Sequence, residues 1–206
     1  MATTVRGVQA HLRHVIVVDD GSTDATGAEA AAAGAEVLRH PANRGKGAAL
    51  RSGLARAKER GFAWALTLDG DGQHAPADIP AFFAAAERTG AELIIGNRLA
   101  AADQMPFVRR KVNQWMTARL ATLTGRALAD SQCGFRLVNL AAWSRVTLRM
   151  EHFEAESEML VEMVRAGFAV EFVPVQVIYG PGGSKIRPLT DAWRWLRWWC
   201  GRTRGA

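Results

Sequence analysis

The chain of 206 residues contains no run of eighteen or more apolar residues and only two cysteines. Its alanine-rich stretch at 28–35 is too short to cross a bilayer and is interrupted by Glu29 and Gly34. No signal-peptide pattern opens the sequence, so we expect a protein in the cytosol or on a membrane surface. Cys133 and Cys200 are too few and too far apart for a zinc motif, and we expect both to be free thiols.

Acidic residues are in the minority, with 20 Asp and Glu against 26 Lys and Arg, and the pI is near 10.1. A hydrophobic content of 49% with 22% charged residues indicates a folded core rather than disorder. The length suits one domain of α/β size. A net charge of +6 favours an anionic partner, which by charge alone is a nucleic acid, a phosphorylated substrate or an acidic lipid.

The most informative segment is LTLDGDGQH at 66–74, which places Asp69 and Asp71 just beyond an apolar strand. Two carboxylates at this spacing can share a hard divalent cation, and the glycine after each lets a diphosphate approach the backbone. An EF-hand loop is excluded, because it needs Gly and Glu where this chain has His74 and Pro80. A metal–nucleotide site, a phosphatase-type Asp nucleophile and a solvated acidic turn stay open on this segment alone.

Strand-like and helix-like segments alternate through the first hundred residues. A β-branched run at 15–18 ends in the polar turn 19–24, and an alanine-rich helix follows. Further strands are predicted at 35–38, 63–68 and 92–95, and helices at 46–60 and 77–88. This alternation predicts an α/β fold with a doubly wound, mainly parallel sheet flanked by helices.

Three polar clusters fall where predicted strands end. They are Asp19-Asp20, the pair Asp69 and Asp71, and the triplet Gly96-Asn97-Arg98. Ligands bind at the carboxyl ends of the strands in such sheets. We therefore expect the three clusters to converge on one edge of the sheet and to form the functional site.

The second half of the chain is predicted to be mainly helical. A helix over 107–123 begins with the basic residues 109–111, and we interpret its apolar stripe as ordinary core packing. The stripe consists of Val108, Val112, Trp115, Met116, Leu120 and Leu123. The turn 130–136 follows, then an acidic amphipathic helix over 154–166 and a strand over 170–177.

The last predicted helix, 189–200, is rich in tryptophan and arginine. Trp193, Trp195, Leu196, Trp199 and Cys200 share one broad arc, with Arg194 and Arg197 on the other side. A helix in the headgroup region of a membrane has this pattern, in which each basic residue near an anionic surface contributes roughly 1 kcal/mol. A helix packed on its own domain fits the pattern equally well.

Six motifs occur in a consistent order: VIVVDDGSTD (15–24), NRGKGAALRSG (43–53), TLDGDGQH (67–74), GNR (96–98), DSQCGFR (130–136) and SK (184–185). Together they resemble the family-2 inverting GT-A glycosyltransferases, and most nearly the dolichyl- and polyprenyl-phosphate sugar synthases. The resemblance implies a Rossmann-like GT-A catalytic domain over 1–188, followed by the amphipathic helix 189–206. Nucleic acid is then not an expected partner.

The resemblance implies a nucleotide-sugar donor, a Mg²⁺ or Mn²⁺ ion and a membrane-held polyprenyl-phosphate acceptor. It assigns Asp19 and Asp20 to the base and ribose, and Asp69, Asp71 and Gln73 to the metal on the donor diphosphate. It assigns Arg98 and Arg110 to phosphate contacts, and with Lys185 they are candidates for positioning the acceptor. Lys46 lies in a glycine-flanked loop, where it is either a diphosphate ligand or a solvated lysine.

The chemistry of the acceptor decides whether a base is needed. A phosphate monoester has a second pKa of about 6, so a lipid phosphate is largely dianionic at neutral pH and needs no general base. A hydroxyl acceptor would need one, and Asp130 or Glu156 would then be the candidate. A bracing role for Asp130 and a surface ion pair for Glu156 are the alternatives.

The chain departs from the family pattern at both ends. Family members open with an apolar strand and a Pro-x-Tyr-Asn-Glu-like turn that contacts the base, and this chain has neither before residue 12. We expect that translation starts upstream of Met1; the alternative is a truncated, inactive copy that only binds. Some relatives carry C-terminal transmembrane helices, so attachment here is expected to be peripheral, on the inner face of the cell membrane, or through a membrane-protein partner.

Two other enzyme classes fit less well. A phosphohydrolase with Asp69 as nucleophile would need Thr or Val at Gln73 and would leave the acidic turn 19–24 unexplained. A P-loop would need Gly and Ser or Thr where the chain has His40 and Gly47, so the segment around Lys46 is not a P-loop.

Overall fold

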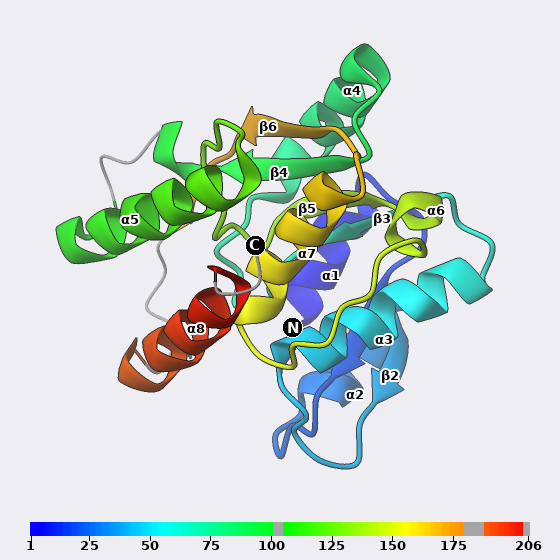
Figure 1. Cartoon of the computed structure of the whole chain (residues 1–206). Helices are drawn as coiled ribbons and strands as arrows, with labels where there is room; N and C mark the ends of the chain where they lie inside the picture. Colours follow the sequence, from blue (N-terminus) through cyan, green and yellow to red (C-terminus); the bar gives the residue numbers. More distant parts are fainter. Residues whose placement is uncertain (101–104, 179–187, 204–206) are drawn as a thin grey trace.

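The computed structural model describes residues 1–100, 105–178 and 188–203 (Figure 1). In chain order the elements are α1 (Ala2–Gln9), β1 (Ile16–Asp19), α2 (Thr26–Ala32), β2 (Glu36–Arg39), α3 (Lys46–Glu59), β3 (Trp64–Thr67), the short 3-10 helix η1 (Pro76–Asp78), α4 (Ile79–Thr89), β4 (Leu93–Asn97), α5 (Phe107–Thr124), β5 (Arg136–Asn139), α6 (Leu140–Trp143), α7 (Glu154–Arg165), β6 (Val170–Pro174) and α8 (Pro188–Thr203). The predicted alternation of strands and helices through the first hundred residues is confirmed.

The strands form two separate sheets. A parallel pair joins β1 to β2, and a four-stranded sheet has the order β3-β5-β4-β6. In that sheet β5 runs antiparallel to both of its neighbours, while β4 and β6 are parallel. The predicted α/β fold with a mainly parallel sheet is therefore confirmed, with β5 as the reversed strand and with a division between β1 and β3.

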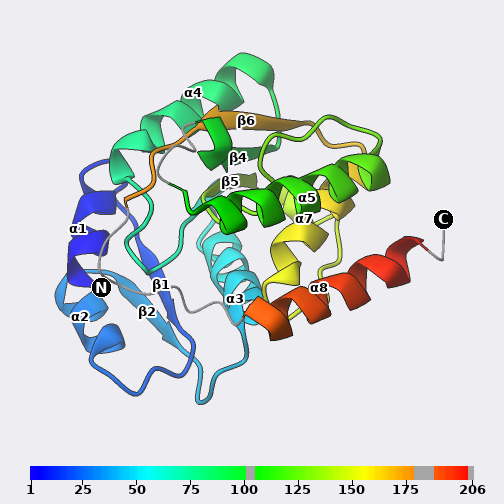
Figure 2. The ribbon, with the colours of Figure 1, turned by 90° about the vertical axis from the view of Figure 1, so that its left-hand side faces the viewer.

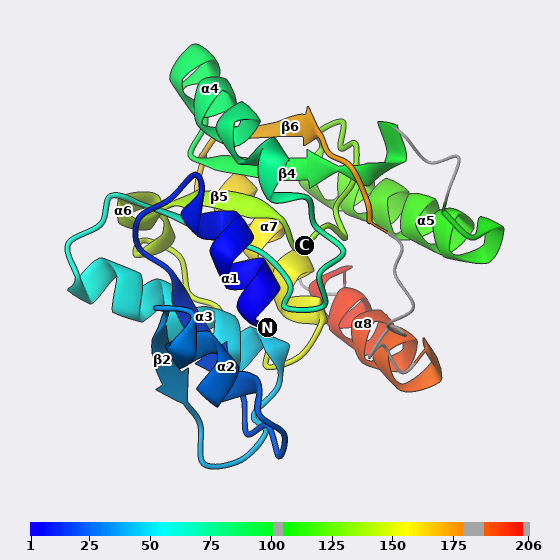
Figure 3. The ribbon, with the colours of Figure 1, turned by 180° about the vertical axis from the view of Figure 1, so that it is seen from behind.

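Helices cover both faces of the sheets. The helices α3 and α7 lie in front in Figure 1, and α1 and α4 lie in front in the reverse view of Figure 3. The middle of the larger sheet is consequently closed to water, and Leu93, Ile94, Ile95 and Leu137 are fully buried. Strands that are covered on both faces need continuous apolar runs, which explains the Leu-Ile-Ile sequence of β4.

The helix α7 is buried on nearly all of its surface. Glu154, Glu156 and Glu158 are buried along with its apolar residues. The expectation of an amphipathic helix with acids on its surface is wrong, because α3, α5 and α8 all pack against α7. A buried carboxylate is costly without an internal partner. Glu156 pairs with Lys46 and Glu158 with Arg202, whereas Oε2 of Glu154 has no hydrogen-bond partner within the described residues.

The stripe of α5 divides between core and surface. Leu120 is fully buried, whereas Val108 is 72% exposed and Trp115 is 42% exposed. Core packing is therefore the wrong interpretation for Val108, Val112 and Trp115, because the first turns of α5 extend past the edge of the larger sheet (Figure 1).

The last helix, α8, is also divided, and its side chains are described from residue 193 to residue 202. Trp195 is buried and donates a hydrogen bond from Nε1 to Ser157 Oγ at 2.9 Å. Arg202 reaches the buried Glu158, with Nη2 3.1 Å from Oε1. Trp193 and Leu196 remain exposed, so the single tryptophan arc expected from the sequence is split between an inner and an outer face.

Both cysteines are free thiols, as expected, with Cys133 buried and Cys200 exposed. Burial raises the pKa of Cys133 to about 11, which leaves its thiol protonated at neutral pH. Among the described helices, none combines the length and the apolar character that a bilayer crossing requires.

Candidate active site at the strand ends

Three charged side chains meet beyond the end of β3. The ammonium Nζ of Lys46 lies 2.7 Å from Oδ1 of Asp69 and 3.0 Å from Oε1 of Glu156. Lys46 is the first residue of α3, and Gly45 before it turns the chain at a φ of 94°. This turn brings the start of α3 against the carboxylates of β3 and α7, where its dipole also favours negative charge.

Gly134 allows the two carboxylates to approach the loop before β5. A Cβ at this position would lie 2.7 Å from Oε1 of Glu156 and 2.8 Å from Oδ2 of Asp69. These separations are shorter than any real Cβ contact. The glycine of the DSQCGFR motif is therefore required by the close packing of the charged cluster, which we call the Lys46 cluster (Lys46, Asp69 and Glu156).

Mutual attraction keeps Lys46 and Asp69 ionised. Burial raises the pKa of Asp69, but the Lys46 ammonium and a contact with His74 outweigh burial and hold that pKa well below its usual range. Burial lowers the pKa of Lys46, but Glu156 and Asp69 together raise it above its usual value.

The turn after Asp69 holds one carboxylate in solvent. Asp71 is exposed, and its Oδ1 accepts a hydrogen bond from the backbone N–H of Gln73 at 3.0 Å. His74 ends the turn as a buried side chain, with Nε2 3.6 Å from Asp69 and Nδ1 without a hydrogen-bond partner. The backbone at His74 forms a bridge with Val177, which fixes this end of the turn.

The donor set is compatible with a hard cation. Within residues 1–100, 105–178 and 188–203, no three His, Cys, Asp or Glu side chains are grouped so that they could hold a metal ion. Mg²⁺ usually binds through one or two carboxylates together with substrate phosphates, so it needs no such group. Asp69 and Asp71 would supply the carboxylates, and a diphosphate would supply the remaining oxygens.

The acidic pair after β1 is occupied by internal partners. Asp19 accepts the backbone N–H of Ser22 at 2.8 Å. Asp20 accepts the N–H groups of Arg44 and Gly45 at 2.9 and 2.8 Å, and lies 2.7 Å from Nδ1 of His40. Burial raises the pKa of Asp20, but these hydrogen bonds outweigh it and lower the pKa. Asp20 thereby holds the loop that leads into Lys46.

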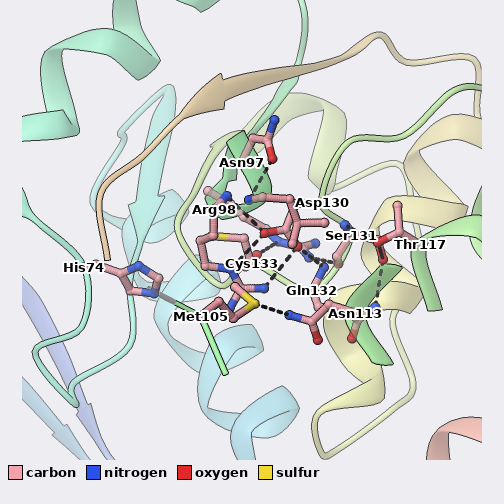
Figure 4. A network of polar contacts seen from close by, with 12 residues as sticks. His74, Asn97, Arg98, Met105, Asn113, Thr117, Asp130, Ser131, Gln132 and Cys133 are labelled. Atoms are coloured by element: carbon pink, nitrogen blue, oxygen red, sulfur yellow. Dashed lines mark hydrogen bonds and ion pairs between the residues drawn. The ribbon is translucent and has the colours of Figure 1, made fainter. Parts of the chain in front are cut away.

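Arg98 and Asp130 form a buried pair (Figure 4). Nε and Nη2 of Arg98 lie 2.8 and 3.0 Å from the two carboxylate oxygens, and the backbone N–H of Arg98 donates to the same group at 3.1 Å. Asp130 is fully buried. Burial lowers the pKa of Arg98, but the attraction of Asp130 outweighs burial and raises that pKa above its usual value, so the guanidinium stays charged.

Comparison with known proteins shows the family of this chain. The sequence pattern of the family described as "Glycosyl transferase family 2" matches residues 2–144, which include the ends of β1, β3 and β4 and the loop 130–136. The chain belongs to this family.

Two relatives of this family-2 chain illustrate the similarity. An uncharacterized protein of Methanocaldococcus jannaschii is 31% identical over 172 residues, which cover 81% of this chain and 71% of the relative. UDP-N-acetylglucosamine–dolichyl-phosphate N-acetylglucosaminyltransferase of Methanococcus voltae is 31% identical over 147 residues, which cover 69% of this chain and 59% of that enzyme. This chain thus spans less than two thirds of the second relative's length.

A solved structure shares the fold. Glucosyl-3-phosphoglycerate synthase from Mycobacterium tuberculosis, in complex with Mn²⁺, UDP and phosphoglyceric acid, superposes with a TM-score of 0.73 at 20% identity. The match covers 98% of this chain and 72% of the synthase. The likeness confirms the expected GT-A type of α/β fold.

The structure of this family-2 chain brings some predicted site residues together and leaves others apart. Asp69 meets Lys46 directly, and Arg98 meets Asp130. Arg110 lies on α5 against the ring of Phe107, 5.7 Å from its centroid. Lys185 lies outside the described residues.

One buried cation was missed by sequence reasoning. Arg136 is almost completely buried and donates to the carbonyl oxygens of Ser131, Cys133 and Glu156 at 2.8, 2.8 and 2.6 Å. It thereby pins the loop 130–136 to the start of α7. The only sequence signal was a charged residue at the beginning of an apolar strand.

Proposed function

We propose that this protein transfers a sugar from a nucleotide-sugar donor to a polyprenyl phosphate at a membrane surface. The observation that carries the proposal is the Lys46 cluster at the strand ends, beside the exposed Asp71, in a chain of glycosyl transferase family 2. The relative from Methanococcus voltae is named for a nucleotide-sugar donor and a dolichyl-phosphate acceptor, which supports this pair of substrates.

The donor diphosphate would lie between Asp71 and Lys46. Asp69 and Asp71, with Gln73 beside them, would hold a Mg²⁺ or Mn²⁺ ion, which when bound would stabilise the charge that develops on the leaving diphosphate. The Mn²⁺ and UDP in the solved synthase support this assignment. Lys46 is close enough to Asp69 to donate to the same diphosphate, and Asp20 would act through the loop that positions Lys46.

The state of the buried carboxylates favours a phosphate acceptor. A general base needs a free carboxylate within reach of the acceptor hydroxyl. Asp130 is fully buried and paired with Arg98, and Glu156 is paired with Lys46. A dianionic lipid phosphate needs no base, so it suits this site better than a hydroxyl acceptor does.

The outer surfaces of α5 and α8 provide the membrane contact in this proposal. Phe107, Val108 and Val112 are exposed on α5, and Trp193 and Leu196 are exposed on α8. The first turns of the two helices lie on the same side of the molecule (Figures 1 and 2). Basic residues flank these apolar side chains: Arg109, Arg110, Lys111, Arg194 and Arg197. Apolar and basic side chains together favour an anionic membrane surface.

We expect Trp193→Ala combined with Leu196→Ala to lower binding to phosphatidylglycerol vesicles by at least about tenfold, because exposed apolar area is lost. Trp195→Ala is the matched control, since its indole is buried against Ser157. This control should instead destabilise the fold by about 3–5 kcal/mol. Vesicle sedimentation and thermal denaturation measure the two effects, and unchanged sedimentation of the double variant would make α8 a packing element only.

The function is tested with labelled GDP-mannose, UDP-glucose and UDP-N-acetylglucosamine as donors. The acceptors are undecaprenyl phosphate and undecaprenol, which differ only in the phosphate, each with Mn²⁺, Mg²⁺ or EDTA. We expect label to reach the phosphate lipid with a divalent ion and not with EDTA. Transfer to undecaprenol would indicate a hydroxyl acceptor, and donor binding without any transfer would indicate an inactive binding protein.

A further inference from the structure

Buried hydroxyl and amide groups connect α5, α7 and α8 through the loop that precedes β5. In that loop, Oγ of Ser131 lies 3.0 Å from Oγ1 of Thr117 on α5, and the backbone N–H of Ser131 donates to the same oxygen at 3.1 Å (Figure 4). The side-chain amide of Gln132 donates to Ser131 at 2.9 Å and to Ser157 on α7 at 3.1 Å. Trp195 on α8 donates to the same Ser157 hydroxyl. Gln132 therefore stands between the contact with α5 and the contact with α7 and α8.

The backbone of Gln132 continues this network to the buried ion pair. Its N–H donates to Oδ1 of Asp130 at 3.1 Å, and both oxygens of Asp130 hold Arg98. Asp130, Ser131 and Ser157 are fully buried. A hydrogen bond is stronger in the interior than in water, and a buried polar group without a partner is costly. Gln132 therefore resists a change in the position of Asp130 relative to the three helices.

The elements that the network joins would bind different parts of the proposed acceptor. The helices α5 and α8 carry the exposed apolar side chains Val108 and Trp193, which the proposed function places at the membrane. Arg98 is a proposed phosphate contact, and its Nη1 takes no part in the pair with Asp130, which uses Nε and Nη2. Because a prenyl phosphate is one molecule, its phosphate can reach Arg98 only if the guanidinium is correctly placed relative to both helices. An error of about 1 Å in such a position can reduce a rate by about 100-fold.

We propose that Gln132 is a positioning residue for the acceptor. Through Asp130 it sets the position of the Arg98 guanidinium relative to α5 and α8, so that the phosphate meets Arg98 while the prenyl chain lies along these helices. This role rests on the proposed function. It concerns the acceptor rather than the donor, because the donor is assigned to Lys46 and Asp69, which form a separate ion pair.

The test replaces Gln132 by methionine. Gln132→Met keeps the length of the side chain and removes both amide donors, while Thr117 and Trp195 remain as partners of the two serine hydroxyls. We expect the KM for undecaprenyl phosphate to rise by at least about tenfold and the KM for the nucleotide sugar to stay within about twofold. Initial rates with each substrate varied in turn measure this difference. A general loss of structure would raise both KM values.

The matched control for stability is Asn139→Ala. Asn139 lies at the end of β5 that is remote from the loop, and its side chain accepts the N–H groups of Ala141 and Ala142, both at 3.0 Å. Each variant thus loses two hydrogen bonds, and we expect both melting temperatures to fall by roughly 2–8 °C. Only Gln132→Met should alter the KM for the acceptor.

A measurement without substrate tests the contact itself. The backbone N–H of Arg98 donates to Asp130 at 3.1 Å, so its hydrogen exchange reports how firmly the carboxylate is held. We expect this amide to exchange at least about tenfold faster in Gln132→Met than in Asn139→Ala. Equal exchange in the two variants would overturn the role of Gln132, as would KM values for donor and acceptor that rise together.

Failure of the proposed function gives a different result. If the unaltered chain transfers no sugar to undecaprenyl phosphate, the proposed function is wrong, and the acceptor role of Gln132 is wrong with it. Transfer by the unaltered chain, combined with equal acceptor KM values in Gln132→Met and Asn139→Ala, would overturn the role of Gln132 alone.

Discussion

Asp71→Ala is expected to lose sugar transfer by a factor of about 10²–10³ or more, with its melting temperature almost unchanged. Asp71 is exposed, and the hydrogen bond that it accepts comes from its near neighbour Gln73. Its removal therefore costs the fold little, while the divalent ion loses one of two carboxylates. Initial rates with undecaprenyl phosphate and thermal denaturation measure the two effects.

The matched control for this prediction is Glu87→Ala, which also removes an exposed carboxylate, from α4. It should leave both transfer and melting temperature unaltered, because surface substitutions away from a site usually change stability by less than about 0.5 kcal/mol. Full activity of the Asp71 variant with Mg²⁺ present would remove the ion from the proposed mechanism.

The second large effect is expected at the pair Arg98–Asp130. Asp130→Ala leaves a buried guanidinium without its carboxylate, and such losses cost about 3–5 kcal/mol. For a chain of this length that corresponds to a fall of roughly 6–20 °C in melting temperature. Thermal denaturation followed by circular dichroism measures it.

A double variant separates the roles of the pair. Arg98→Met with Asp130→Leu removes both charges, and a well-packed apolar pair is often as stable as the buried ion pair it replaces. We expect most of the stability to return while transfer stays impaired, because Arg98 is a proposed phosphate contact. Full transfer by the double variant would contradict both a phosphate contact by Arg98 and a catalytic role for Asp130.

The sequence predicted the strands that carry the candidate site. Polar residues after these strands were predicted to bind ligands, because the strand ends of a parallel sheet share an edge. Glycines such as Gly134 indicated positions where other groups approach the backbone closely. The sequence did not show which side chains approach Gly134. The strands β1, β3 and β4 all lie within about two residues of their predicted positions.

The pairing of charges could not be predicted in the same way. Lys46 meets Glu156 only because α3 and α7 pack side by side, and Arg98 meets Asp130 across a gap of 32 positions. The sequence shows which residues carry charge, but long-range partners depend on the folded packing of whole elements. For the same reason, Trp195 and Trp193 on one helix could not be sorted into inner and outer residues.

The contact between Arg202 and Glu158 has a geometric consequence for the reaction. Glu158 is fully buried, and its carboxylate also accepts the backbone N–H groups of Arg149 and Met150 at 2.8 and 2.9 Å. Detaching α8 would leave this carboxylate without its cation, so the terminal helix moves together with α7, which also carries Glu156. The proposed bilayer-facing surface and the reacting centre then form one rigid body. In the proposed membrane-bound state, the protein would set the height of that centre above the lipid headgroups, and acceptors would be selected by the depth at which their phosphate lies.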